Sequence, residues 1–116
     1  MIESIPRTIM GIFNFSGAGF DTPITLEGLA PYRVPGDKRA QLIYLRAGNA
    51  SGELIVLVLM RNGTPMRLFP VGAKSDAHVS LAVVEDLFAD TELAVRIAAP
   101  AGLSSVVVLD MGLMEI

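Results

Sequence analysis

The sequence contains no cysteine and no tryptophan, and it has a single histidine, His78. Without cysteine the chain cannot form a disulfide, an iron–sulfur cluster or a thiolate zinc site. One histidine cannot build the multi-histidine sites that hold catalytic metals. We therefore expect no bound metal and no cofactor.

Charged residues are also scarce. They make up 18% of the 116 residues, whereas a typical soluble domain has about 25%. Hydrophobic residues reach 52%, and the mean hydropathy is +0.54. A small protein with so few charged residues must expose apolar surface to water, and a subunit interface would cover that surface. The composition therefore favours self-association over a monomer whose surface is diluted by alanine and glycine.

Basic clusters are missing as well. The net charge is −3, and the nearest approach to a basic cluster is Lys38-Arg39. Nucleic-acid binding needs a basic surface that displaces counterions, so we expect no nucleic-acid partner.

Long hydrophobic runs are absent too. The longest, Leu54 to Met60, is far shorter than the roughly 20 residues of a membrane helix. Glu3 and Pro6 stand where a signal peptide would carry its basic and apolar regions. We therefore expect a cytoplasmic protein without membrane partners, folded as one domain over residues 1–116.

What the sequence does contain is repeated alternation of apolar and polar residues between turn signals, which predicts strands. The expected strands cover residues 9–15, 22–26, 41–47, 54–60, 66–71, 78–84, 93–97, 106–109 and 113–116, the last two forming one long strand kinked at Gly112. The segment from Gly28 to Lys38 reads as a loop, and Glu85 to Thr91 as a single helical turn.

Two strands carry further information. The run from Leu54 to Met60 is apolar on both faces, which predicts a central strand or one that also contributes to a subunit contact. Asn62-Gly63 after it predicts a two-residue type I′ hairpin, since both residues tolerate positive φ.

Short strands separated by turns every 8 to 12 residues or so are typical of a sandwich. The fold class we expect is all-β: an antiparallel β-sandwich of jelly-roll or related Greek-key type with about seven or eight strands. Its core should combine Val79, Leu81 and Val83 with Leu93, Val95 and Ile97, because residues two apart share a face.

Catalytic constellations are not visible. No GxSxG-type motif surrounds a serine, so His78 is expected on the polar face of its strand rather than in a triad. Glu85, Asp86 and Asp90 lack the spacing of a calcium loop, which favours a solvated loop and leaves calcium binding there as an alternative. We expect no enzymatic activity.

Asp110 ends the apolar run VVVLD. An acid there either pairs with an arginine or backbone amide at a strand end, or forms part of a binding rim. The structural role is the preferred interpretation, because buried acids are usually hydrogen-bonded partners.

From Leu45 onward, Arg46 and Asn49 lie at a strand end, Asn62-Gly63 forms a hairpin turn, and Leu109-Asp110 precedes the last strand. In this layout the last two-thirds of the chain resembles carbohydrate-binding jelly-roll modules of the galactose-binding-like type. The resemblance implies a jelly-roll fold. It also implies a ligand-binding rim of Arg46, Asn49, Asn62 and Asp110.

Two functions follow as hypotheses. The first is a non-catalytic interaction or assembly module, a self-associating accessory or structural subunit that can also bind a protein partner. The alternative is a small-ligand or carbohydrate-binding module.

Overall fold

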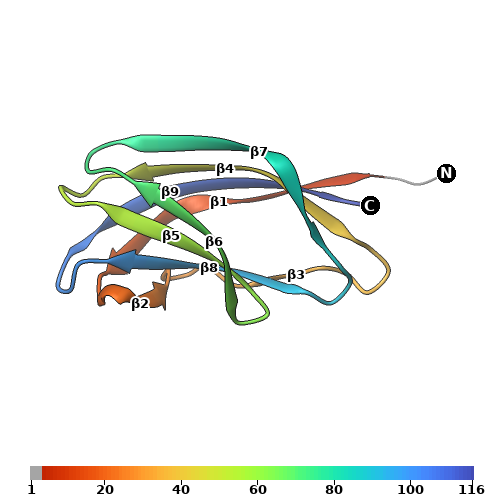
Figure 1. Cartoon of the computed structure of the whole chain (residues 1–116), viewed down its shortest axis with the longest axis horizontal. Coiled ribbons are helices and arrows are strands. Elements are labelled where there is room, and N and C mark those ends of the chain that lie inside the picture. The colour runs from red at the N-terminus through yellow and green to blue at the C-terminus, as the bar shows by residue number, and fades with distance from the viewer. Residues whose placement is uncertain (1–3) are drawn as a thin grey trace.

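The computed structural model of the protein describes residues 4–116, without the side chains of residues 82–85. It is an elongated sandwich, 49 × 24 × 23 Å, built from strands (Figure 1). The strands are β1 (Ile5–Ser16), β2 (Gly19–Thr25), β3 (Tyr32–Arg33), β4 (Ala40–Asn49), β5 (Ile55–Arg61), β6 (Thr64–Val71), β7 (Asp76–Leu87), β8 (Glu92–Ala99) and β9 (Ser104–Glu115). No helix in the described part of the chain is long and apolar enough to cross a membrane.

The two sheets have the strand orders β1-β9-β4-β7 and β2-β8-β5-β6, and β3 adds to β8. Pairing is antiparallel throughout and nested: the first long strand pairs with the last, β2 with β8, β4 with β7, and β5 with β6. Nested pairs wound into two sheets form a jelly roll. The expected fold class is therefore confirmed.

Each sheet turns one row of alternate residues toward the other sheet, and these rows form the core. Leu93, Val95 and Ile97 of β8 are buried, as expected. Val79 and Leu81 of β7 are half-buried and pack against the same core. The side chain of Val83, expected beside them, lies outside the described residues.

The apolar run at Leu54 to Met60 becomes β5, a central strand of its sheet, as one of its two interpretations predicted. Leu57 and Leu59 face the core, whereas Val58 and Met60 face outward and are only 3% and 4% exposed. These outward residues pack with alanines of β8 in a second small apolar cluster. One chain alone therefore buries both faces of β5.

The hairpin after β5 has the predicted geometry. Arg61 pairs with Thr64, and the two residues between them, Asn62 and Gly63, have φ values of 49° and 80°. Positive φ at both central residues is the signature of a type I′ turn.

Two local predictions were wrong. The loop expected at Gly28 to Lys38 contains the short strand β3, whose Tyr32 and Arg33 pair with β8. No helical turn follows Glu85, because β7 continues to Leu87. The last two expected segments do form one long strand, β9, which runs from Ser104 to Glu115.

Candidate functional site

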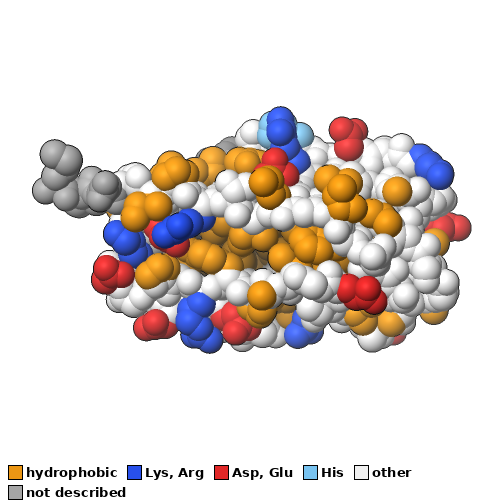
Figure 2. All heavy atoms as spheres, turned by 180° about the vertical axis from the view of Figure 1, so that it is seen from behind, with side chains coloured by type: hydrophobic (Ala, Val, Ile, Leu, Met, Phe, Trp, Pro, Cys, Tyr) orange, Lys and Arg blue, Asp and Glu red, His pale blue; other side chains and the backbone are white. Residues whose placement is uncertain are grey.

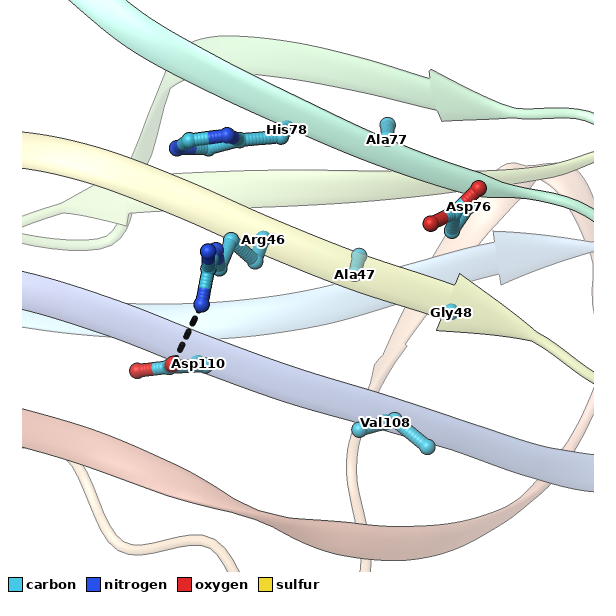
Figure 3. A pocket seen from close by; sticks show the side chains of 8 residues that line it. All are labelled: Arg46, Ala47, Gly48, Asp76, Ala77, His78, Val108 and Asp110. Carbon is cyan, nitrogen blue, oxygen red and sulfur yellow. Dashed lines mark ion pairs between the residues drawn. The ribbon is translucent and has the colours of Figure 1, made fainter.

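The outer face of the β1-β9-β4-β7 sheet carries a polar cluster at its centre. Arg46 of β4 lies directly opposite Asp110 of β9, and both side chains point outward. The Arg46 Nη1 and Asp110 Oδ2 atoms are 3.9 Å apart, a loose and mostly solvated ion pair (Figure 3). At this distance the two groups form no direct hydrogen bond, so both keep hydrogen-bonding capacity for a ligand.

Tyr44 anchors the carboxylate of this pair. Its hydroxyl donates a hydrogen bond of 3.0 Å to Asp110 Oδ1, and this bond is the main reason why the pKa of the Tyr44 hydroxyl is raised. A phenol that donates to a carboxylate gains nothing by ionising beside it. Asp110 is thus fixed in orientation while its second oxygen faces Arg46.

His78 completes the cluster from the edge strand β7. It lies opposite Arg46 in the sheet register, and its ring stands edge-on to that of Tyr44, with centroids 6.2 Å apart and planes at 90°. The expected place of His78 on the polar face of its strand is confirmed, since the residue is exposed.

Arg46, Asp110 and His78 border a shallow depression of about 560 Å³ (Figure 3). It continues toward the end of β4 in a second depression of about 530 Å³, and the two share Gly48, Asp76 and Val108. Gly48 has no side chain, so the sheet surface is open between Val108 on one side and Asp76 on the other. The lining offers a guanidinium, an imidazole, two carboxylates and one apolar wall.

The structure brings together only two of the four residues predicted for a binding rim, Arg46 and Asp110. Asn49 ends the same strand but is buried. Its Nδ2 lies 2.7, 3.2 and 3.1 Å from the carbonyl oxygens of Glu53, Val71 and Gly72. Its Oδ1 accepts hydrogen bonds from the backbone and hydroxyl of Ser51. The side chain is fully occupied in joining two loops, so it cannot serve a ligand.

Asn62 lies on the other sheet, in the hairpin between β5 and β6. Its Oδ1 accepts a hydrogen bond of 2.8 Å from the Glu92 backbone N–H. Asn49 and Asn62 thus lie near opposite ends of β5. The prediction that they belong to one binding rim was wrong. Sequence layout gave their order along the chain but not the sheet to which each belongs.

The sequence reasoning missed Gly48, Asp76 and Val108, which line the depression, and Tyr44, whose hydroxyl holds Asp110. Strand alternation could have indicated Tyr44 and Gly48, because they share parity with Arg46 along β4. Asp76 and Val108 needed the pairing of β4 with β7 and β9, which no local pattern specifies.

A second polar cluster lies at the other end of β9. Glu115 is 2% exposed and accepts hydrogen bonds from Tyr32 (2.5 Å) and Arg7 (3.1 Å). The bond from Tyr32 is the largest cause lowering the pKa of Glu115, and burial chiefly raises the pKa of Tyr32. Because Tyr32 and Glu115 belong to opposite sheets, this cluster ties the sandwich together, and both carboxylate oxygens are used.

Neither cluster contains the set of ligands that a metal ion needs. Among the residues whose side chains the structure describes, no three or more histidine and acidic groups are placed to hold an ion. The alternative of calcium binding near Glu85, Asp86 and Asp90 stays a prediction, because the Glu85 side chain lies outside the described residues. Asp86 pairs with Arg39 at 3.3 Å.

The second candidate region is the free edge of β1. Alternate residues of this strand face the core, including Ile9 and Phe13, and the others face outward. Met10 and Ile12 are 70% and 73% exposed, the highest values among the large exposed hydrophobic residues. Figure 2 looks onto this side of the molecule and shows a band of hydrophobic side chains along its middle.

No family model matches the sequence, and no curated protein is similar to it. Solved structures similar to this chain include an insecticidal delta-endotoxin from Bacillus thuringiensis (15% identity, TM-score 0.45), the structure of infectious bursal disease virus (12%, 0.47) and an exo-β-1,3-galactanase from Phanerochaete chrysosporium (11%, 0.41). They cover 96%, 98% and 99% of this chain, which spans only 19%, 33% and 30% of theirs. The likeness is one of fold.

Proposed function

We propose that this protein is a non-catalytic assembly module, which associates with further copies of itself through the β1 side of the sandwich. The observation that carries the proposal is the β1 edge itself. A strand at the edge of a sheet presents unpaired backbone N–H and C=O groups, and a long apolar edge is a template for another strand. β1 runs for 12 residues and pairs with β9 without a register shift.

Apart from the two-residue strand β3, the other edge strands of the described sheets carry features that discourage pairing. β2 contains Pro23 and a register shift against β8. β6 contains Pro65 and Pro70 and also shifts register. β7 is interrupted by a bulge against β4. Prolines and bulges of this kind are how proteins prevent edge-to-edge contact.

β1 is left almost without such protection. Pro6 is its second residue, and Arg7 is its one charged residue. The ten residues that follow Pro6 include no further proline and no lysine. On the outward face, Met10 and Ile12 are exposed to water in a single chain. Contact with a second molecule along β1 would cover them.

Light scattering after size exclusion tests the proposal across a micromolar concentration range. The expected mass is at least twice the 12.3 kDa of one chain. Ile12→Lys should shift the protein to a monomer without loss of strand content. Leu68→Lys is the matched control, because Leu68 is a 65% exposed outward residue on the other sheet. A monomer at every concentration, or equal effects of both variants, would refute the proposal.

A second function is favoured by the Arg46–Asp110 depression, and we propose it as the alternative: recognition of a polar small molecule such as a sugar. A guanidinium beside a carboxylate can bind neighbouring hydroxyls as donor and acceptor, and Val108 offers an apolar surface next to them. Glycan-array screening with wild type and Asp110→Ala is the test, with Asp37→Ala as the control on an exposed loop. Binding lost only in Asp110→Ala would support this function, and no binding to any glycan would exclude it.

A further inference from the structure

From the geometry of β1 we infer that two copies pair their β1 strands antiparallel about a two-fold axis at Gly11, joining their sheets into one. This inference rests on the proposed function and specifies the partner and the register. The joined sheet would have eight strands, four from each copy. A second copy is the occupant because its own sequence supplies the matching residues.

The symmetry of such a pair limits the choice of register. A two-fold axis perpendicular to the sheet leaves each face on its own side, so outward residues must lie opposite outward residues. Two residues that lie opposite each other are then both even-numbered or both odd-numbered, so the axis must pass through a residue and not between two residues. Centring the pairing on Met10 or Gly11 matches eleven of the twelve residues of β1, and any other allowed centre matches fewer.

The side chains distinguish these two registers. With Gly11 on the axis, Met10 lies opposite Ile12 of the other copy, so the two most exposed apolar side chains cover each other. With Met10 on the axis, Ile12 would instead face Thr8. The remaining outward pairs about Gly11 are polar with polar, or small with small: Thr8 with Asn14, and Pro6 with Ser16. The register centred on Gly11 therefore pairs outward side chains of similar polarity.

The middle of the inward row fits the same axis. Half-buried Ile9 lies opposite Phe13 of the other copy, extending each core across the boundary. Gly11 sits where the two strands would meet, and the Phe13 ring of its own strand already lies over it, 2.7 Å from the position a Cβ would take. The ring shields the bare backbone of an edge glycine, as aromatic residues do in sheets.

Charge does not oppose this contact. The one charged residue of β1, Arg7, is held by Glu115 of its own chain. About Gly11, the two Arg7 residues would be separated by eight residues along the strands, about 27 Å at 3.4 Å per residue. That distance is well beyond the Debye length of about 8 Å at physiological ionic strength.

Cysteine cross-linking tests the register directly, because the chain has no cysteine of its own. Met10→Cys mixed with Ile12→Cys, and Thr8→Cys mixed with Asn14→Cys, should form disulfide-linked heterodimers at least tenfold faster than the control mixture of Thr8→Cys with Ile12→Cys. The control pair is opposite only if Met10 lies on the axis. Mixtures equilibrate first at micromolar concentration, and mild oxidation is followed by non-reducing electrophoresis and mass spectrometry.

The outcomes separate the inference from the function beneath it. If the unmodified protein is monomeric by light scattering, the proposed function and the pairing both fail. If it is dimeric and the control mixture, or Met10→Cys alone, links fastest, the Gly11 register is wrong while assembly stands. If it is dimeric and none of these pairs links, β1 pairing is refuted and another surface forms the dimer.

Discussion

The ring of Tyr44 lies flat against Gly112 of the neighbouring strand, so that a Cβ on Gly112 would stand 2.0 Å from Tyr44 Cε2. The glycine thus makes room for the ring whose hydroxyl holds Asp110. Gly112→Ala should displace Tyr44 and destabilise the fold by about 1–3 kcal/mol, the usual cost of overpacking. Chemical denaturation measures this.

Gly48→Ala is the control for that variant. A Cβ there would meet Val108 at 3.6 Å, an ordinary contact, so the change should stay within about 0.5 kcal/mol. Equal stability of both variants would show that the ring does not depend on Gly112.

The hairpin turn offers a test of backbone conformation alone. Gly63 has φ of 80° and open space where a Cβ would lie. Gly63→Ala should therefore cost about 1 kcal/mol, through the left-handed conformation and not through a clash. Gly52→Ala, which also faces open space but without a positive φ, should cost less. An unchanged melting temperature for Gly63→Ala would contradict the type I′ geometry.

The Tyr32–Glu115 bond predicts an acid dependence of stability. The pKa of Glu115 is lowered in the folded protein, so its contribution is present above the unfolded value of about 4.3 and is lost as the pH falls through the folded pKa. Tyr32→Phe removes the largest cause of that lowering. Acid unfolding of this variant should begin at a higher pH than in wild type.

Tyr44→Phe is the matched control, because it removes a tyrosine–carboxylate bond at the surface of the sheet. Its acid transition should coincide with that of wild type. Coinciding transitions for Tyr32→Phe and wild type, followed by circular dichroism, would show that Glu115 does not depend on this bond.

The two faces of β5 predict similar sensitivity to change. Leu59→Ala should cost about 2–5 kcal/mol, since the residue is fully buried in the main core. Val58→Asp should also destabilise the single chain, because Val58 is buried in the outer cluster. A folded but dissociated Val58→Asp protein would instead place the interface on this sheet and contradict assembly through β1.

The sequence allowed the strands, the hairpin and the fold class to be predicted, because alternation and turn chemistry are local signals. It did not reveal that Arg46 and Asp110 would be joined by Tyr44 and His78, since this depends on strands far apart in the chain pairing in one register. Asn49 shows the limit most clearly. The resemblance to carbohydrate-binding modules implied a ligand contact for it, but the alternation along β4 turns its side chain inward, where loop carbonyls accept hydrogen bonds from its amide.

The composition likewise showed an excess of apolar residues, but it did not show where on the protein they would be exposed. The two-sided run at Leu54 to Met60 was expected to be either a central strand or part of a subunit contact, and most of its residues are buried within one chain. The two most exposed of the large apolar residues lie instead on β1, where Met10 and Ile12 alternate with core residues and carry no distinctive sequence signal. Only the sheet order shows that this strand has a free edge.

Hydrogen exchange of the β1 amides at two protein concentrations tests assembly through this edge most directly. Amides that point to β9 are bonded in one chain, whereas the alternate amides of residues 6–16 point to the free edge. The account predicts that these alternate amides exchange quickly in dilute protein and become protected at high concentration, while the amides of β6 do not change. Exchange in β1 that is independent of concentration, in a protein that light scattering shows to be associated, would contradict it.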